Sequence, residues 1–244
     1  MREWCVRTRR RLPHWYVRGR AHFVTFRLAC TVPRAVGDLW RERRAREREL
    51  LLRAGADPAD ADQLLHKRLF GWYDRYLDDA EHPRRWLGDP RVASLVREAL
   101  AHFDGERYRL LSYAIMPNHV HVLVQLAGFA RPAAPPDAAA REFHPCGEAA
   151  DQRSPLARVL HSWKSFTANA ANQVLGRTGP FWHPESYDHW IRADRELLRV
   201  AAYIARNPVK AGLCAAAEDY PWTAAHELAA RGRDPRGLLA RYAN

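Results

Sequence analysis

The sequence predicts an α+β protein built as a ferredoxin-like sandwich, in which an antiparallel sheet carries helices on one face. Three observations favour this class. Short β-branched runs alternate with longer segments that repeat apolar residues at helical spacing. The elements follow in the order strand, helices, strand, strand, helix, strand, which is the ferredoxin-like order. The chain has 244 residues, of which 47% are hydrophobic, and this is enough to bury the core of one domain with insertions.

The first half of the chain predicts one strand and three helices. Residues 21–28 alternate and are rich in β-formers, so they form the first strand. Two charged helices follow over residues 38–53 and 58–78, separated by a glycine and an Asp-Pro start signal. We interpret residues 33–80, which contain both helices, as a helical insertion. A third helix over residues 90–103 carries valines and leucines at helical spacing.

The second half adds a hairpin, a helix and a last strand. Residues 109–115 and 120–126 form the two hairpin strands, joined by a tight turn. Residues 127–155 are rich in alanine and proline and show no period, so we expect a flexible insertion there. An apolar stripe predicts a helix over residues 156–175, and a strand follows over residues 181–190.

Two histidines stand two residues apart where the second hairpin strand begins. Side chains on a strand alternate between faces, so His119 and His121 point the same way while Val120 faces the core. A Met-Pro-Asn turn at residues 116–118 precedes them. Two such imidazoles can bind one divalent ion or one phosphate group. Ordinary hydrogen-bonded or solvated histidines are the alternative that this short motif leaves open.

The last informative element is a helix that begins at Asp194 and that we expect to end at Asn207, because Pro208 restricts the residue before it. Tyr203 projects roughly 160° away from the centre of the apolar face, so it is not an obvious core tyrosine. Asn207 lies one turn later and can reach the same small volume as the Tyr203 hydroxyl. A surface tyrosine beside a helix-ending asparagine remains the alternative.

Charge and composition limit the classes of partner. The 39 basic and 28 acidic residues give a net charge of +11, which favours a polyanion and makes nucleic acid the expected partner. No apolar run approaches the ~20 residues of a membrane span, and no apolar signal region begins the chain. We therefore expect a cytoplasmic, nucleoid-associated protein. The four cysteines form no Cys-x-x-Cys pair, which indicates neither a disulfide framework nor a thiolate zinc site.

Basic and aromatic side chains provide the expected DNA contacts. We divide the chain into a basic arm at residues 1–19, one domain at 20–226 and a tail at 227–244. The arm interleaves arginines with tryptophans, which suits phosphates and unstacked bases, although a solvated terminus has the same composition. Basic residues near the predicted metal site would hold phosphates or stay solvated. The candidates are Arg10, Arg11 and Trp15 in the arm, and Lys164, Arg192 and Lys210 beyond it.

Two motifs together resemble the REP-associated tyrosine transposases, relatives of the single-tyrosine HUH transposases of insertion sequences. One is MPNHVH at residues 116–121, and the other is the Tyr-Ile-x-x-Asn-Pro-Val-Lys-Ala-Gly run at residues 203–212. The resemblance covers most of the chain apart from the two insertions. It extends through residues 10–14, 23–27, 163–166 and 182–192.

The resemblance implies an HUH endonuclease type of fold, with His119 and His121 as metal ligands, Asn207 as the third ligand and Tyr203 as the nucleophile. The implied ion is Mg²⁺ or Mn²⁺, although two imidazoles would equally admit Zn²⁺ or Ni²⁺. The implied activity is a metal-dependent single-stranded DNA endonuclease and strand transferase. It would act on REP-like palindromic hairpins through a 5′-phosphotyrosine intermediate.

Other readings of the same residues stay open. Tyr187, on the predicted last strand, is a rival nucleophile. A DNA-binding regulator could use the same fold without catalysis, although the complete set of motif residues argues against it. A metal hydrolase with a water nucleophile would need a carboxylate base, and the acidic residues nearest to the histidines in sequence are Asp104 and Glu106.

Overall fold

The protein is described by a computed structural model that covers residues 5–9, 13–79, 84–126 and 154–234. Nearly all of the insertion expected over residues 127–155 lies outside the described residues. Arg10 and Arg11 lie outside them as well.

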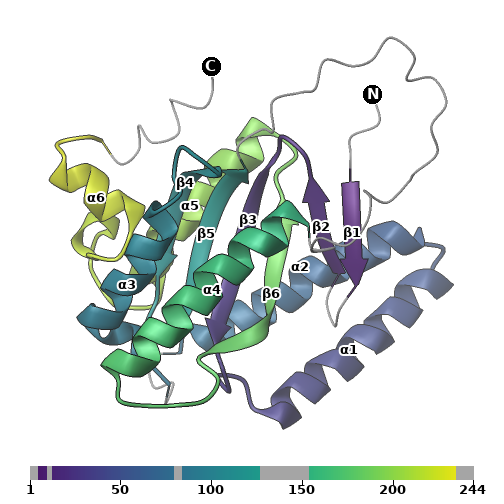
Figure 1. The fold of residues 1–244 in the computed structure, drawn as a ribbon. Coiled ribbons are helices and arrows are strands. Elements are labelled where there is room, and N and C mark those ends of the chain that lie inside the picture. Colours follow the sequence, from purple (N-terminus) through teal and green to yellow (C-terminus); the bar gives the residue numbers. More distant parts are fainter. Residues whose placement is uncertain (1–4, 10–12, 80–83, 127–153, 235–244) are drawn as a thin grey trace, which may run out of the picture.

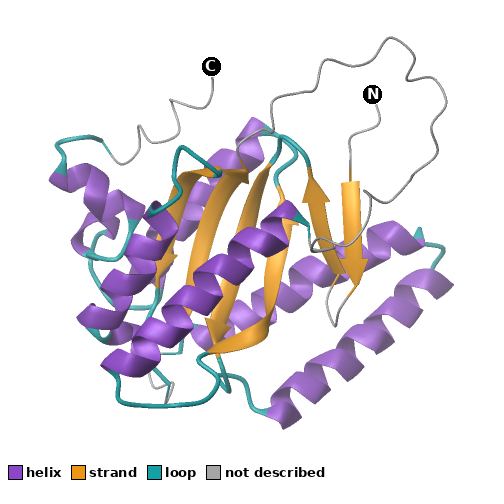
Figure 2. Ribbon diagram, viewed as in Figure 1, coloured by secondary structure: helices purple, strands orange, loops and turns teal. Residues whose placement is uncertain are grey.

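A four-stranded antiparallel sheet forms the centre of the molecule, as Figures 1 and 2 show. Its order is β4-β5-β3-β6, so β3 and β5 are the inner strands. Helices α1, α2 and α3 lie between β3 and β4 in the chain, and α4 lies between β5 and β6; this order confirms the predicted ferredoxin-like α+β class. The strands are β3 (Ala21–Leu28), β4 (Tyr108–Ile115), β5 (His119–Leu126) and β6 (Trp182–Trp190).

Helices α3 (Pro90–Ala101) and α4 (Pro155–Val174) cover one face of the sheet (Figure 1). Both start with a proline in the first turn and a capping side chain, Asp89 for α3 and Ser154 for α4. The core beneath them is almost wholly apolar. It includes Val24, Phe26, Val92, Val96, Val120, Val122, Val124, Leu160 and Trp163.

Helices α2 (Pro58–Leu77) and α5 (Asp194–Lys210) lie on the opposite face, where Phe70 and Ile204 pack near Phe23 and Leu123 of the sheet. The expected helices on one face are thus present, and α2 and α5 add a second helical layer that the sequence did not predict. The reason is that β3 and β5 place large apolar side chains on this face too, and these must be removed from water.

Two predicted helix boundaries are corrected. Helix α1 spans Arg34–Arg53, so it begins before residue 38, and it lies beside α2. Helix α5 does not end at Asn207 but continues through Pro208 to Lys210, where the Ala211 amide donates to the Asn207 carbonyl at 2.9 Å. A proline disfavours a helical residue before it without forbidding one, and only a short stretch of helix follows here.

The remaining elements are peripheral. The expected arm contains a two-stranded sheet of β1 (Cys5–Arg9) and β2 (Pro13–Val17). Helix α6 (Ala224–Ala230) runs across the boundary that we expected at residue 226. Two short 3-10 helices span Trp86–Gly88 and Ala217–Asp219. None of the helices in the described ranges is long and apolar enough to cross a membrane.

Candidate active site

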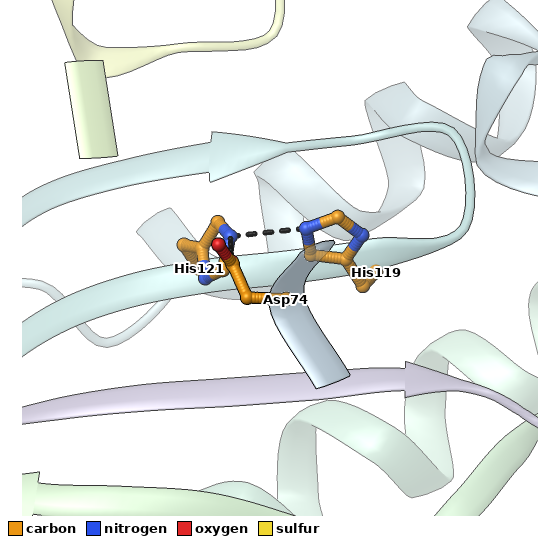
Figure 3. A group of neighbouring side chains, drawn as sticks. All are labelled: Asp74, His119 and His121. Atoms are coloured by element: carbon orange, nitrogen blue, oxygen red, sulfur yellow. Dashed lines mark hydrogen bonds and ion pairs between the residues drawn. The ribbon is translucent and has the colours of Figure 1, made fainter. Parts of the chain in front are cut away.

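The two histidines of β5 share one face of the sheet, as predicted. Their Nε2 atoms lie 3.0 Å apart, and both side chains are fully buried. Figure 3 shows the two rings on the same strand, with the contact between them as a dashed line. Val120 and Val122 belong to the core on the opposite face. The alternation of a single strand therefore separates the site from the larger apolar core.

The Nδ1 atoms of both histidines are held by neighbours. The Nδ1 of His119 lies 2.6 Å from the Asn118 side-chain oxygen, and the Nδ1 of His121 lies 2.7 Å from the Thr25 hydroxyl on β3. Asn118 also donates to the Leu77 carbonyl at 2.8 Å, which ties the turn before β5 to the end of α2. Such outer contacts fix the ring orientation of metal-binding histidines. They direct both Nε2 atoms toward one small volume.

Helix α2 brings two carboxylates to this volume. The Oδ1 of Asp74 lies 3.5 Å from the His121 Nε2 (Figure 3), and the Oδ1 of Asp78 lies 3.9 Å from the His119 Nε2. Both carboxylates are about nine-tenths buried or more. Donor atoms of Asp74, His119 and His121 all lie within 4.8 Å of one another. The expectation that no carboxylate lies near the histidines is therefore wrong.

Lys210 neutralises these carboxylates from α5. Its ammonium group donates to Asp74 at 2.9 Å and to Asp78 at 2.7 Å. Burial and the Asp74 charge raise the pKa of Asp78 to about 6, and Lys210 opposes that rise. Lys210, which we expected to contact DNA phosphate, is thus engaged by carboxylates inside the site.

Tyr203 of α5 meets the same group. Its hydroxyl donates a hydrogen bond to Asp74 and accepts one from the Asn207 side chain at 3.2 Å. Burial, followed by the Asp74 charge, raises the pKa of Tyr203 well above its ordinary value. The ring of Tyr203 packs edge-on against Phe23, with centroids 5.9 Å apart, so it faces the sheet more closely than predicted.

Among the described residues, two buried side-chain oxygens of the groups that meet here have no hydrogen-bond partner. They are the Oδ1 of Asn207, whose residue is 1% exposed, and the Oδ1 of Asp78. Buried acceptors are normally satisfied, and a cation satisfies them without a donor hydrogen. Two imidazole nitrogens with carboxylate and amide oxygens form a donor set that suits Mn²⁺, Mg²⁺ or Zn²⁺. The residues present therefore fit a divalent metal ion.

The rival tyrosine lies in a different environment. Tyr187 of β6 stacks on Phe70 and on His66, with ring centroids 4.3 and 4.5 Å apart. Burial raises its pKa strongly. In the described part of the chain its hydroxyl makes no hydrogen bond to a carboxylate or imidazole of the site. This geometry favours Tyr203 over Tyr187 as the group next to the histidines.

The other expected DNA contacts are not brought together. The Lys164 ammonium group donates to the His183 and Pro184 carbonyls at 2.6 and 3.1 Å, near the start of β6. Arg192 follows the other end of β6, with its guanidinium 5.0 Å from the Trp190 ring centroid. Trp15 lies on β2, and its side chain is outside the described part of the structure.

Comparison with solved structures finds a similar fold in a REP-associated tyrosine transposase bound to a REP hairpin. The alignment has a TM-score of 0.51 and 16% sequence identity, and it covers 91% of this chain and 87% of that chain. No family model and no curated protein matches the sequence. At this identity the likeness establishes the fold alone, and it agrees with the predicted ferredoxin-like α+β sandwich.

Proposed function

We propose that this protein is a metal-dependent single-stranded DNA endonuclease and strand transferase that acts on palindromic hairpin DNA, as a REP-associated tyrosine transposase. One observation carries the proposal. The Tyr203 hydroxyl, the Asp74 carboxylate and two imidazoles meet in one buried volume, although they come from three elements. The net charge of +11 and the fold shared with a hairpin-bound transposase support DNA as the substrate.

His119 and His121 are the proposed metal ligands, with Asn207 as the third ligand expected from the motif. The geometry adds Asp74 as a further donor, because its Oδ1 is close to His121. The proposed ion is Mg²⁺ or Mn²⁺, which the carboxylate and amide oxygens favour. When bound, such an ion polarises the scissile phosphate and orients it for in-line attack.

Tyr203 is the proposed nucleophile. Its oxygen forms a bond to phosphorus while the bond from phosphorus to the 3′ oxygen breaks, and the departing 3′ oxygen takes a proton from water to become a 3′-hydroxyl. The proton of Tyr203 moves to Asp74, which already accepts its hydrogen bond. The 5′-phosphotyrosyl link conserves the phosphodiester energy, so a second 3′-hydroxyl can reverse the step. Cleavage and strand transfer then need no ATP.

Asp74 and Asp78 also favour a second candidate, a metal hydrolase with a water nucleophile, since they supply the base that the sequence lacked near the histidines. One experiment separates the functions. The protein is incubated with Mn²⁺ and single-stranded hairpin oligonucleotides from its genomic neighbourhood, and products are resolved on a denaturing gel. We expect cleavage with a covalent adduct that maps to Tyr203. Cleavage without an adduct would indicate a water nucleophile, and binding without cleavage would indicate a DNA-binding regulator.

A further inference from the structure

Arg27 of β3 lies beside the candidate active site. In the register between β3 and β5, Arg27 pairs with His119, and Thr25 pairs with His121. The Thr25 hydroxyl contacts the His121 ring, so Thr25 faces the site. Side chains two residues apart on a strand share a face, which puts the Arg27 side chain on the same face. Arg27 is therefore next to the histidines, where β3 ends and β5 begins.

Neutral groups hold the Arg27 guanidinium. It donates to the Thr31 hydroxyl at 2.8 Å, and its carbon lies 5.5 Å from the Tyr73 ring centroid. Tyr73 precedes Asp74 on α2, so one helix turn supports the arginine and supplies a carboxylate to the site. Thr31 is itself fixed by donating to the Leu28 carbonyl at 2.9 Å. The guanidinium is thus positioned by neighbours that do not balance its charge.

No carboxylate of the described residues forms an ion pair with Arg27, and burial lowers its pKa. Lys210, the cation of the candidate site, is by contrast balanced by two aspartates. A partly buried charge without a counter-ion is unfavourable. Among the described residues nothing balances the Arg27 charge, so an anion from outside the chain would supply its counter-ion.

His183, at the start of β6, lies close enough to Arg27 and Lys164 for both charges to act on its ring. Burial, Arg27 and Lys164 together lower the pKa of His183 to about 4, so its ring is neutral at pH 7. Two basic side chains thus act on the end of the sheet where the histidines lie. Positive potential there attracts the backbone of a nucleic acid.

We propose that Arg27 binds a DNA phosphodiester group next to the phosphate that Tyr203 would attack. This inference rests on the proposed function, and it adds a substrate contact that neither sequence motif assigns. A guanidinium presents several N–H donors in a planar fork that matches two phosphate oxygens. Thr31 and Tyr73 hold the fork in advance, so little rotamer freedom is lost on binding. Arg27 would then fix the position of the strand over the histidines.

The test measures DNA binding under conditions that prevent metal-dependent cleavage of the strand. Fluorescence anisotropy follows binding of a labelled 20-nucleotide oligothymidine to the full chain in excess chelator, over a range of salt concentrations. We expect Arg27→Gln to weaken binding roughly tenfold at about 0.1 M salt. The slope of log affinity against log salt should become shallower by about 0.7, the value for one phosphate contact on a single strand. The matched control is Arg46→Gln on α1, whose side chain is 72% exposed.

A slope equal to that of Arg46→Gln would overturn the inference while leaving the proposed function standing. Failure of the wild-type protein to bind the oligonucleotide would instead count against the proposed function. A second measurement does not depend on folding of the glutamine variant. The Nε–H signal of Arg27, assigned by its loss in Arg27→Lys, should shift when the wild type is titrated with oligothymidine. An unmoved signal at saturation, or an equal shift with inorganic phosphate at matched ionic strength, would refute binding of the DNA strand.

Discussion

The two faces of the sheet are built from the same strands, but one face packs into an apolar core and the other carries the candidate active site. On β5, Val120, Val122 and Val124 point into the apolar core under α3 and α4, whereas His119 and His121 point toward α2 and α5. The first face gains free energy by removing apolar surface from water. The second face also buries apolar side chains such as Phe23 and Leu123, but in addition it buries two imidazoles that need partners. These partners are Asp74, Thr25 and Asn118.

This difference shows how a small sheet can support a reactive site. Burying imidazoles and carboxylates is unfavourable unless each is paired, so the polar face depends on contacts between distant segments. The apolar face does not depend on any single pair, because dispersion and hydrophobic contacts are spread over many side chains. Substitutions on the polar face should therefore remove function first, and substitutions on the apolar face should remove stability first.

The largest expected effect is on the nucleophile. Tyr203→Phe should lower DNA cleavage by roughly 10⁴-fold or more, because it removes the attacking oxygen. Hairpin binding should change little, since the ring still packs against Phe23. Cleavage is measured by the yield of covalent adduct and product on a denaturing gel.

Tyr187→Phe is the control for that measurement. Its ring stacks on Phe70, and its hydroxyl is not part of the group around the histidines, so activity should remain. If Tyr187→Phe were inactive and Tyr203→Phe active, the nucleophile assignment would be wrong.

The next prediction compares substitutions on the two faces of β5. His119→Ala or His121→Ala should each lower Mn²⁺ affinity by more than the roughly 10–100-fold caused by losing an outer contact of a ligand, and cleavage should disappear. Val122→Ala, on the opposite face of the same strand, should lower the free energy of unfolding by roughly 2 kcal/mol. Metal affinity is measured by calorimetry and stability by urea denaturation. Equal metal affinity in the three variants, or wild-type activity in excess chelator, would contradict the metal site.

A smaller loss of Mn²⁺ affinity is expected when Asp74 is substituted. Asp74→Asn keeps the shape of the side chain but removes the charge, so Mn²⁺ affinity should fall about tenfold. Asp60→Asn, an exposed change near the start of the same helix, should leave Mn²⁺ affinity as in the wild type. Calorimetric titration of the three proteins decides the question. Wild-type affinity in Asp74→Asn would leave Asn207 as the expected third ligand.

Local patterns in the sequence predicted the fold and half of the site. The order of elements, the hairpin around residues 116–118 and the shared face of His119 and His121 follow from periods of 2 and 3.6 residues, which a few neighbouring positions determine. The structure agrees with each of these. Tyr203 and Asn207 were brought together by the same reasoning, since one helix turn separates them.

The carboxylates were missed because they depend on packing between distant segments. We interpreted residues 33–80 as a helical insertion and assigned none of its residues to the site, yet α2 places Asp74 against Tyr203, 129 positions later in the chain. Periodicity places a residue on a helix face but does not say which sheet face that helix will cover. A signal was available in Asp74 and Asp78, since two aspartates one turn apart at the end of a helix are unfavourable beside the negative end of its dipole. Acidic residues there suggest a cation, which Lys210 supplies.

The smallest expected effect tests a buried histidine on the apolar face. His22 of β3 is fully buried, accepts a hydrogen bond from the Val17 amide and stacks on Tyr16. Burial lowers the pKa of His22 from its usual 6.5 to about 4. Between these two values the unfolded chain binds the proton that the folded chain excludes. The resulting stability is therefore complete above pH 6.5 and is lost as the pH falls toward 4.

The free energy of unfolding of metal-free protein should thus decrease on acidification, and His22 should contribute up to ~1.4 kcal/mol per pH unit within that window. His22→Gln keeps an acceptor for the Val17 amide but cannot be protonated, so its stability should vary less between pH 6.5 and 4. His121, whose pKa is also lowered to about 4, and Asp78, whose raised pKa acts in the opposite direction, are present in both proteins and cancel in the difference. Urea denaturation of both proteins at several pH values, in chelator, measures this difference in the free energy of unfolding. Parallel pH profiles for the two proteins would mean that His22 is not held neutral, and that the apolar face admits water or an anion that the present packing excludes.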